Sequence, residues 1–148
     1  MLVVFLLSGV CHAKSDSFQQ VYIGFNGLHE PEVTYFHSEQ EVRRSWLASN
    51  IKKLRLDEIV SKINFKKQVL LLVAVGDRGN VATGNIYIKQ IINGDHILAY
   101  ADVGVSGEDC KYSYDNSYPF SLSIAPKPKK SQFLSGFYIQ NFSDVCKE

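Results

Sequence analysis

The sequence predicts a single α+β domain that consists mainly of an antiparallel β-sheet or a small β-sandwich, with one or two helices near its N-terminal end. Three observations predict it: apolar runs of strand length in the second half of the chain, an Asn-Gly-Asp turn between two of them, and a capped amphipathic segment ahead of them. The chain has 148 residues, which suits one domain. No repeat, linker or low-complexity tract divides it, so we expect residues 14–148 to form one β-rich domain.

Residues 1–13 are predicted to be a signal peptide. Residues 2–7 are an unbroken apolar run, and no charged residue occurs before Lys14. Such a run is too short to span a bilayer but fits the apolar core of a signal, with cleavage after Ala13. A basic residue near the start is missing, so a buried N-terminal strand and a lipid anchor through Cys11 are the alternatives. The signal predicts a periplasmic or secreted protein.

Export also predicts a disulfide bond. Removal of the signal takes Cys11 away and leaves Cys110 and Cys146, an even pair in an oxidising compartment. The bond would close a loop of about 37 residues, which the chain-entropy description values at roughly 4 kcal/mol. The alternatives are two free thiols or a nucleophilic Cys110. No Cys-x-x-Cys or Cys/His cluster accompanies the pair, so no metal site is predicted.

One helix is predicted to begin at Ser38. Ser38 and Glu41 have the spacing of a capping box, in which each side chain bonds to a backbone amide of the other residue. Val42 and Trp46 lie four positions apart and therefore share one face. Trp46 is the only tryptophan in the chain, and we expect it to anchor the core. Apolar residues at helical spacing predict a second helical segment over residues 54–63.

The strands are predicted from apolar runs and alternation. Residues 69–75 are continuously apolar, which is typical of a central strand buried on both faces. Asn93-Gly94-Asp95 is the strongest hairpin signal in the chain. In the returning strand the odd-numbered residues from Ile97 to Val105 are apolar or small and share one face. The expected strands are residues 21–25, 33–36, 69–75, 81–92, 96–105, 120–125 and 136–142.

Charge and motifs exclude several function classes. The formal net charge is +1, whereas a nucleic-acid-binding protein needs a basic face to displace counterions from phosphates. The glycines between Gly76 and Gly84 lack the Gly-Lys-Ser/Thr ending of a phosphate-binding loop. No Gly-x-Ser-x-Gly elbow supports a hydrolase triad. We therefore predict no nucleic-acid partner, no transmembrane segment and no cofactor.

Two sets of segments resemble the PrcB C-terminal-like domain family. The first is Ile63 to Val69 leading into an apolar strand, then Gly76, then Thr83-Gly84 and Ile86-Tyr87-Ile88. The second is Ser117-Tyr118-Pro119-Phe120, an apolar strand and Ala125-Pro126-Lys127. The resemblance covers roughly residues 39–142. It implies a small secreted β-rich domain, and the namesake of the family is an accessory that stabilises an exported protease complex.

Two surface segments are candidate contact sites. Tyr and Phe near strand ends are enriched at binding surfaces, which makes candidates of Tyr112, Tyr114, Tyr118 and Phe120. The basic run at Lys127 and Lys129 would meet an acidic partner or anionic lipid, or else would protect a sheet edge. The sequence thus favours an exported, non-catalytic accessory or binding protein, with a protease complex as one partner to consider. The alternatives are a small hydrolase or ligand-binding enzyme with a dispersed site, and a structural envelope component.

Overall fold

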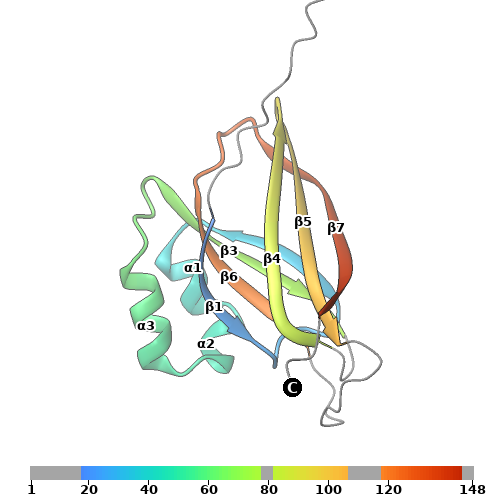
Figure 1. Cartoon of the computed structure of the whole chain (residues 1–148). Helices are drawn as coiled ribbons and strands as arrows, with labels where there is room; N and C mark the ends of the chain where they lie inside the picture. Colours follow the sequence, from blue (N-terminus) through green and yellow to red (C-terminus); the bar gives the residue numbers. More distant parts are fainter. Residues whose placement is uncertain (1–17, 78–81, 107–117, 145–148) are drawn as a thin grey trace, which may run out of the picture.

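The computed structural model describes residues 18–77, 82–106 and 118–144. These residues form three short helices and seven strands in two sheets (Figure 1), which confirms the α+β class predicted from the sequence. In chain order the elements are β1 (Gln19–Gly24), β2 (Pro31–Phe36), α1 (Glu39–Arg44), α2 (Leu47–Asn50), α3 (Lys53–Ser61), β3 (Gln68–Val75), β4 (Ala82–Asn93), β5 (His96–Ser106), β6 (Phe120–Pro126) and β7 (Phe133–Asp144).

The strands are arranged in two facing sheets. The first sheet has the order β1-β6-β3-β2, and all its neighbours are antiparallel. The second has the order β4-β5-β7, in which β4 and β5 are antiparallel but β5 and β7 are parallel. Figure 1 shows the helices on one side of the first sheet and the steeply inclined second sheet on the other. The described chain therefore has three layers, with the first sheet in the middle.

Strand β3 forms the centre of the core. Leu70 and Leu72 face the helices, whereas Leu71 and Val73 face the second sheet, and all four are fully buried. Burying one such side chain stabilises the folded state by about 1.5–3 kcal/mol. Because β3 is covered on both faces, the side chains on each face stabilise the fold. The predicted central strand over residues 69–75 is confirmed.

The helical layer begins at the predicted cap. The Ser38 hydroxyl accepts a hydrogen bond from the Glu41 amide at 3.2 Å. The Glu41 carboxylate reaches one residue further back than expected and accepts from the His37 amide at 2.7 Å. Trp46 is partly buried and packs edge-on against Phe120, with ring centres 5.1 Å apart. The predicted second helical segment is α3, and α2 is an additional short turn between it and α1.

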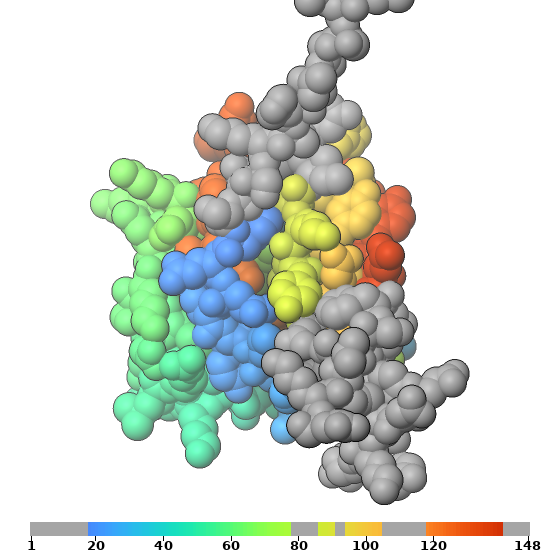
Figure 2. Space-filling view, viewed as in Figure 1, coloured from blue at the N-terminus to red at the C-terminus, as the bar shows by residue number. Residues whose placement is uncertain are grey.

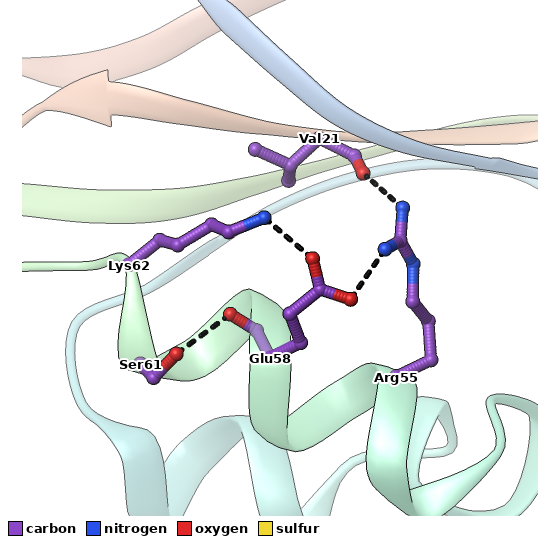
Figure 3. A network of polar contacts seen from close by, with 5 residues as sticks. All are labelled: Val21, Arg55, Glu58, Ser61 and Lys62. Atoms are coloured by element: carbon purple, nitrogen blue, oxygen red, sulfur yellow. Dashed lines mark hydrogen bonds and ion pairs between the residues drawn. The ribbon is translucent and has the colours of Figure 1, made fainter.

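A surface network fastens α3 to the first sheet (Figure 3). The Glu58 carboxylate accepts from Lys62 at 2.7 Å and from Arg55, which also donates to the Val21 carbonyl of β1 at 3.5 Å. The hydrogen bond from Lys62, followed by that from Arg55, lowers the pKa of Glu58. Because these groups are exposed, each pair contributes little to stability. The network positions α3 rather than holding the fold together.

The second sheet is built on the predicted hairpin. Asn93 pairs with His96 across Gly94 and Asp95, and Gly94 has φ +60°, a conformation that suits glycine. The inward residues of β5 are buried as the alternation predicts, and they include Ile97 and Ala101. Strand β7 then joins the free side of β5, after the chain has passed through β6 in the other sheet.

The two flanks of the sandwich differ. On one flank, the Gln20 side chain of β1 donates to the Ile86 carbonyl of β4 at 2.9 Å and to the Ser121 hydroxyl at 2.8 Å. This bridges the two sheets. On the other flank lie the outer strands β2 and β7, with residues 127–132 passing from β6 to β7. Within the described ranges, no helix is both long and apolar enough to cross a membrane.

Candidate functional site

A cavity of about 420 Å³ lies on the flank of β2 and β7. It is open to solvent and is lined by the end of β2, the beginning of β5, the beginning of β7 and the connection between β6 and β7. Three lysines and two aromatic residues are among its lining. The full lining is Tyr35, His37, Ile97, Lys127, Pro128, Lys129, Lys130, Gln132, Phe133 and Leu134.

The connecting segment that carries the lysines is held at several points. At its start, the Lys127 amide donates to the Lys67 carbonyl at 2.9 Å, and the Lys127 ammonium donates to the Phe65 carbonyl at 3.2 Å. At its end, the Gln132 side chain accepts from the Lys129 amide at 2.9 Å and donates to the Gly94 carbonyl at 3.3 Å. The segment is therefore fastened both to the turn that precedes β3 and to the β4–β5 hairpin.

The cavity is basic. Lys129 and Lys130 are exposed, and neither takes part in an ion pair with any residue that the structure describes. Lys127 is exposed too, but its ammonium already donates to a backbone carbonyl. No Asp or Glu belongs to the lining as far as the structure describes it. Nearby positive charges without a compensating carboxylate favour an anionic occupant.

Apolar surface accompanies this charge. Phe133 remains 52% exposed although it is the first residue of a strand, and its ring packs edge-on against His96 at 4.8 Å. Pro128 and Leu134 are only partly buried. An occupant with both a carboxylate and an apolar portion would therefore find complementary surface for each.

Tyr35 belongs to the lining, and its hydroxyl is buried. Its ring packs against the core between the sheets, and its hydroxyl is shielded from solvent without a hydrogen-bond partner among the described residues. Burial raises the pKa of Tyr35 to about 12. The ring contributes to the cavity wall, but the hydroxyl is not presented to an occupant.

The predicted contact residues do not form one site. Lys127 and Lys129 both line the cavity. Tyr118 lies elsewhere: its backbone bonds to Phe25 and Gly27 at 2.8 Å each, and its ring packs on His29. Tyr112 and Tyr114 lie outside the described residues, as do Cys110 and Cys146 of the predicted disulfide.

Phe120 requires a correction. It is 2% exposed and packs against Tyr22 and Trp46 in the core under the helices. It cannot belong to a contact surface in this structure. Its aromatic neighbours in the sequence suggested a surface cluster, but the inward position at the start of β6 decides its role.

A second exposed aromatic surface lies on the second sheet, whose strands reach the surface on the side away from the helices (Figure 2). Tyr100 and Tyr138 stack there with ring centres 5.3 Å apart. Tyr87 and Tyr138 are 57% and 55% exposed. The only charged groups described beside them are Lys89 and Asp102, which pair at 2.6 Å and so neutralise each other. This face offers stacking surface but no net charge to select an occupant.

The described part of the cavity lining contains one imidazole, that of His37, and no Ser, Thr, Cys, Asp or Glu. The other side chains of this lining that can transfer a proton are three lysines and Tyr35, whose hydroxyl is shielded from solvent. Across the described ranges, no group of three or more His, Cys, Asp and Glu residues is placed to hold a metal ion. The exposed lysines of the lining suit the binding of an anion.

Comparison of the chain with models of protein families, with curated proteins and with solved structures finds no match in any of the three. The resemblance to the PrcB C-terminal-like domain family therefore stays a prediction from the sequence. The candidate site rests on its own geometry.

Proposed function

We propose that this chain is an exported, non-catalytic binding protein that holds an acidic segment of another exported protein at the cavity between β2 and β7. The observation that carries the proposal is that Lys127, Lys129 and Lys130 line a partly apolar cavity with no carboxylate among its described lining residues. Sequence reasoning singled out two of these lysines. Tyr35 and Phe133, which supply apolar wall, come from distant parts of the chain.

The energetics favour a modest, salt-dependent interaction. An exposed ion pair contributes about 0.2–1 kcal/mol, and ionic screening acts over about 8 Å at physiological salt. The exposed part of the Phe133 ring adds burial at about 25 cal/mol per Å² of apolar surface removed from water. Charge would thus select and steer the partner, and apolar contact would retain it.

An accessory role fits these properties. The resemblance to the PrcB C-terminal-like domain family implies a domain that stabilises an exported protease complex. A protein of that kind needs a contact surface rather than a catalytic centre, and an acidic segment of an exported protease complex is the partner that we propose. Export through residues 1–13 and a bond between Cys110 and Cys146 belong to the same proposal.

The experiment compares two double substitutions of equal charge. Lys129→Gln with Lys130→Gln removes the two cavity lysines that form no ion pair with a described residue. Lys52→Gln with Lys53→Gln removes two exposed lysines at the start of α3. Both are surface changes with small expected effects on stability. Each protein is crosslinked in the envelope of the cells that make it, and the captured segments are identified by mass spectrometry.

We expect the unaltered protein and the α3 variant to capture the same acidic segment, and the cavity variant to lose it. The loss should be reproduced by raising the salt concentration. Equal capture by both variants would refute the cavity as the contact site. Recovery of no partner, together with substrate turnover that one substitution at His37 abolishes, would replace the binding protein with an enzyme.

A further inference from the structure

Strand β7 has an open edge. It spans 12 residues and pairs only with β5 among the described strands. In a parallel pair, alternate residues direct their N–H and C=O groups away from the neighbour. About half of the β7 residues therefore present backbone groups to the outer side, where no described strand receives them.

This edge lacks the usual protection. Natural edge strands are blunted by Pro, by Lys or by shortness. Phe133–Asp144 contains no Pro, Lys or Arg. The other edge strands are protected. Strands β1 and β2 are short, with six residues each, and β2 begins with Pro31. Strand β4 is bridged to β1 through Gln20. The only irregularity of β7 is the register shift around Ser135, at its beginning.

Half-buried apolar side chains lie along the same edge. Phe137 and Ile139 pack against the core between the sheets but are only partly buried. A further strand beside β7 would cover them, because residues of adjacent strands that point to one face lie about 5 Å apart. On its outer side, β7 thus has both backbone groups that no described strand receives and apolar side chains that are only partly covered.

The basic cavity lies at the beginning of this edge. Phe133 and Leu134, the first two residues of β7, line it together with Lys129 and Lys130. A segment that lies along β7 and reaches past its first residue enters the cavity. Charge complementarity requires that the end entering the cavity be acidic.

We propose that the acidic segment binds by strand addition, as an extended strand antiparallel to β7 with its acidic carboxyl-terminal end at Lys129 and Lys130. This proposal rests on the proposed function and specifies how that site takes its partner. Antiparallel pairing is the slightly more stable arrangement. It also brings the carboxyl-terminal end of the segment to the beginning of β7, so that a terminal carboxylate adds to its acidic side chains.

The test uses synthetic peptides as long as β7, with alternating threonine and valine and two glutamates at the carboxyl end. One derivative is N-methylated at the odd positions of the alternating part and another at the even positions. A strand that adds to an edge uses the amides of only one set. We expect one derivative to lose binding by about tenfold or more and the other to bind like the parent peptide.

Amide hydrogen exchange supplies the second readout. Binding of the parent peptide should slow exchange in residues 136–140 of β7, and the double substitution of Lys129 and Lys130 should remove this protection while that of Lys52 and Lys53 retains it. A peptide with the glutamates at its amino end should bind more weakly. Tighter binding of that peptide would overturn the antiparallel orientation.

The outcomes separate the two proposals. Equal binding of the two N-methylated peptides, or no protection of β7, would overturn strand addition while the lysine dependence still supported the cavity. Peptide binding that is unchanged by the double substitution of Lys129 and Lys130 would overturn the proposed function itself. Protection of β7 that grows with protein concentration without peptide would show that a second copy of the chain takes the edge, which also overturns the proposal.

Discussion

Replacement of Tyr35 by Phe is expected to stabilise the protein. The Tyr35 hydroxyl is shielded from solvent and has no hydrogen-bond partner among the described residues. A buried polar group in that position costs about 1–3 kcal/mol of folding free energy. Phe keeps the ring that packs between the sheets and removes only the oxygen, at a cost of a few tenths of a kcal/mol in lost contact. The net expectation is a gain of about 1 kcal/mol in the free energy of unfolding.

The assay is urea unfolding at neutral pH, followed by the fluorescence of Trp46. Tyr138→Phe is the matched control, because its side chain is 55% exposed and its change should lie within about 0.5 kcal/mol of zero. A loss of 1 kcal/mol or more in the Tyr35→Phe protein would refute the reasoning. It would mean that the hydroxyl is bonded in the folded protein.

The same substitution has a signature in alkaline solution. The pKa of Tyr35 is raised by burial from 10.0 to about 12. Between these values the folded state holds the proton that the unfolded state has lost, so the free energy of unfolding falls as pH rises. The fall amounts to at most about 2 kcal/mol, since solvent still reaches part of the ring. The stability advantage of the Tyr35→Phe protein over the unaltered protein should therefore widen above pH 10. A difference that stays constant with pH would contradict the assignment.

Three further predictions concern the scaffold. Gly24→Ala should destabilise by about 1–3 kcal/mol in urea unfolding, because a Cβ there would lie 2.4 Å from a ring carbon of Phe120; an unchanged midpoint would show that the ring moves aside freely. Ser38→Ala should cost about 1 kcal/mol through loss of the α1 cap, whereas no change would mean that the Glu41 carboxylate suffices. Cys110→Ser or Cys146→Ser should each cost up to about 4 kcal/mol, and alkylation of both thiols in the exported, unaltered protein would contradict the bond.

Local signals in the sequence predicted most of the elements. The apolar run of β3, the Asn-Gly-Asp turn and the Ser38 cap each depend on neighbours within a few residues, and each is where the pattern placed it. The alternation of β5 likewise identified its buried face. Such features are specified by backbone geometry and period, which a single sequence displays directly.

Long-range pairing was beyond those signals. Strand β7 runs parallel to β5, but nothing in residues 133–144 indicates this. The alternation of side chains along a strand looks alike whether its neighbour is parallel or antiparallel. The cavity was missed for the same reason. Lys127 and Lys129 attracted notice as a basic run, but Tyr35 and His37 lie about ninety positions earlier and meet them only through the fold.

One connection explains both the cavity and the open edge. The hairpin at Gly94 commits one side of β5 to β4, so a strand that pairs with β5 on its return from β6 can do so only on the other side of β5. That return makes β7 the outer strand, and the passage between the sheets places Lys129 and Lys130 at its beginning. The lysines that would otherwise protect an edge thus lie beside the edge rather than on it. A charge in that position leaves the backbone groups of β7 accessible and favours an acidic strand over a neutral one, which is how an open edge acquires specificity.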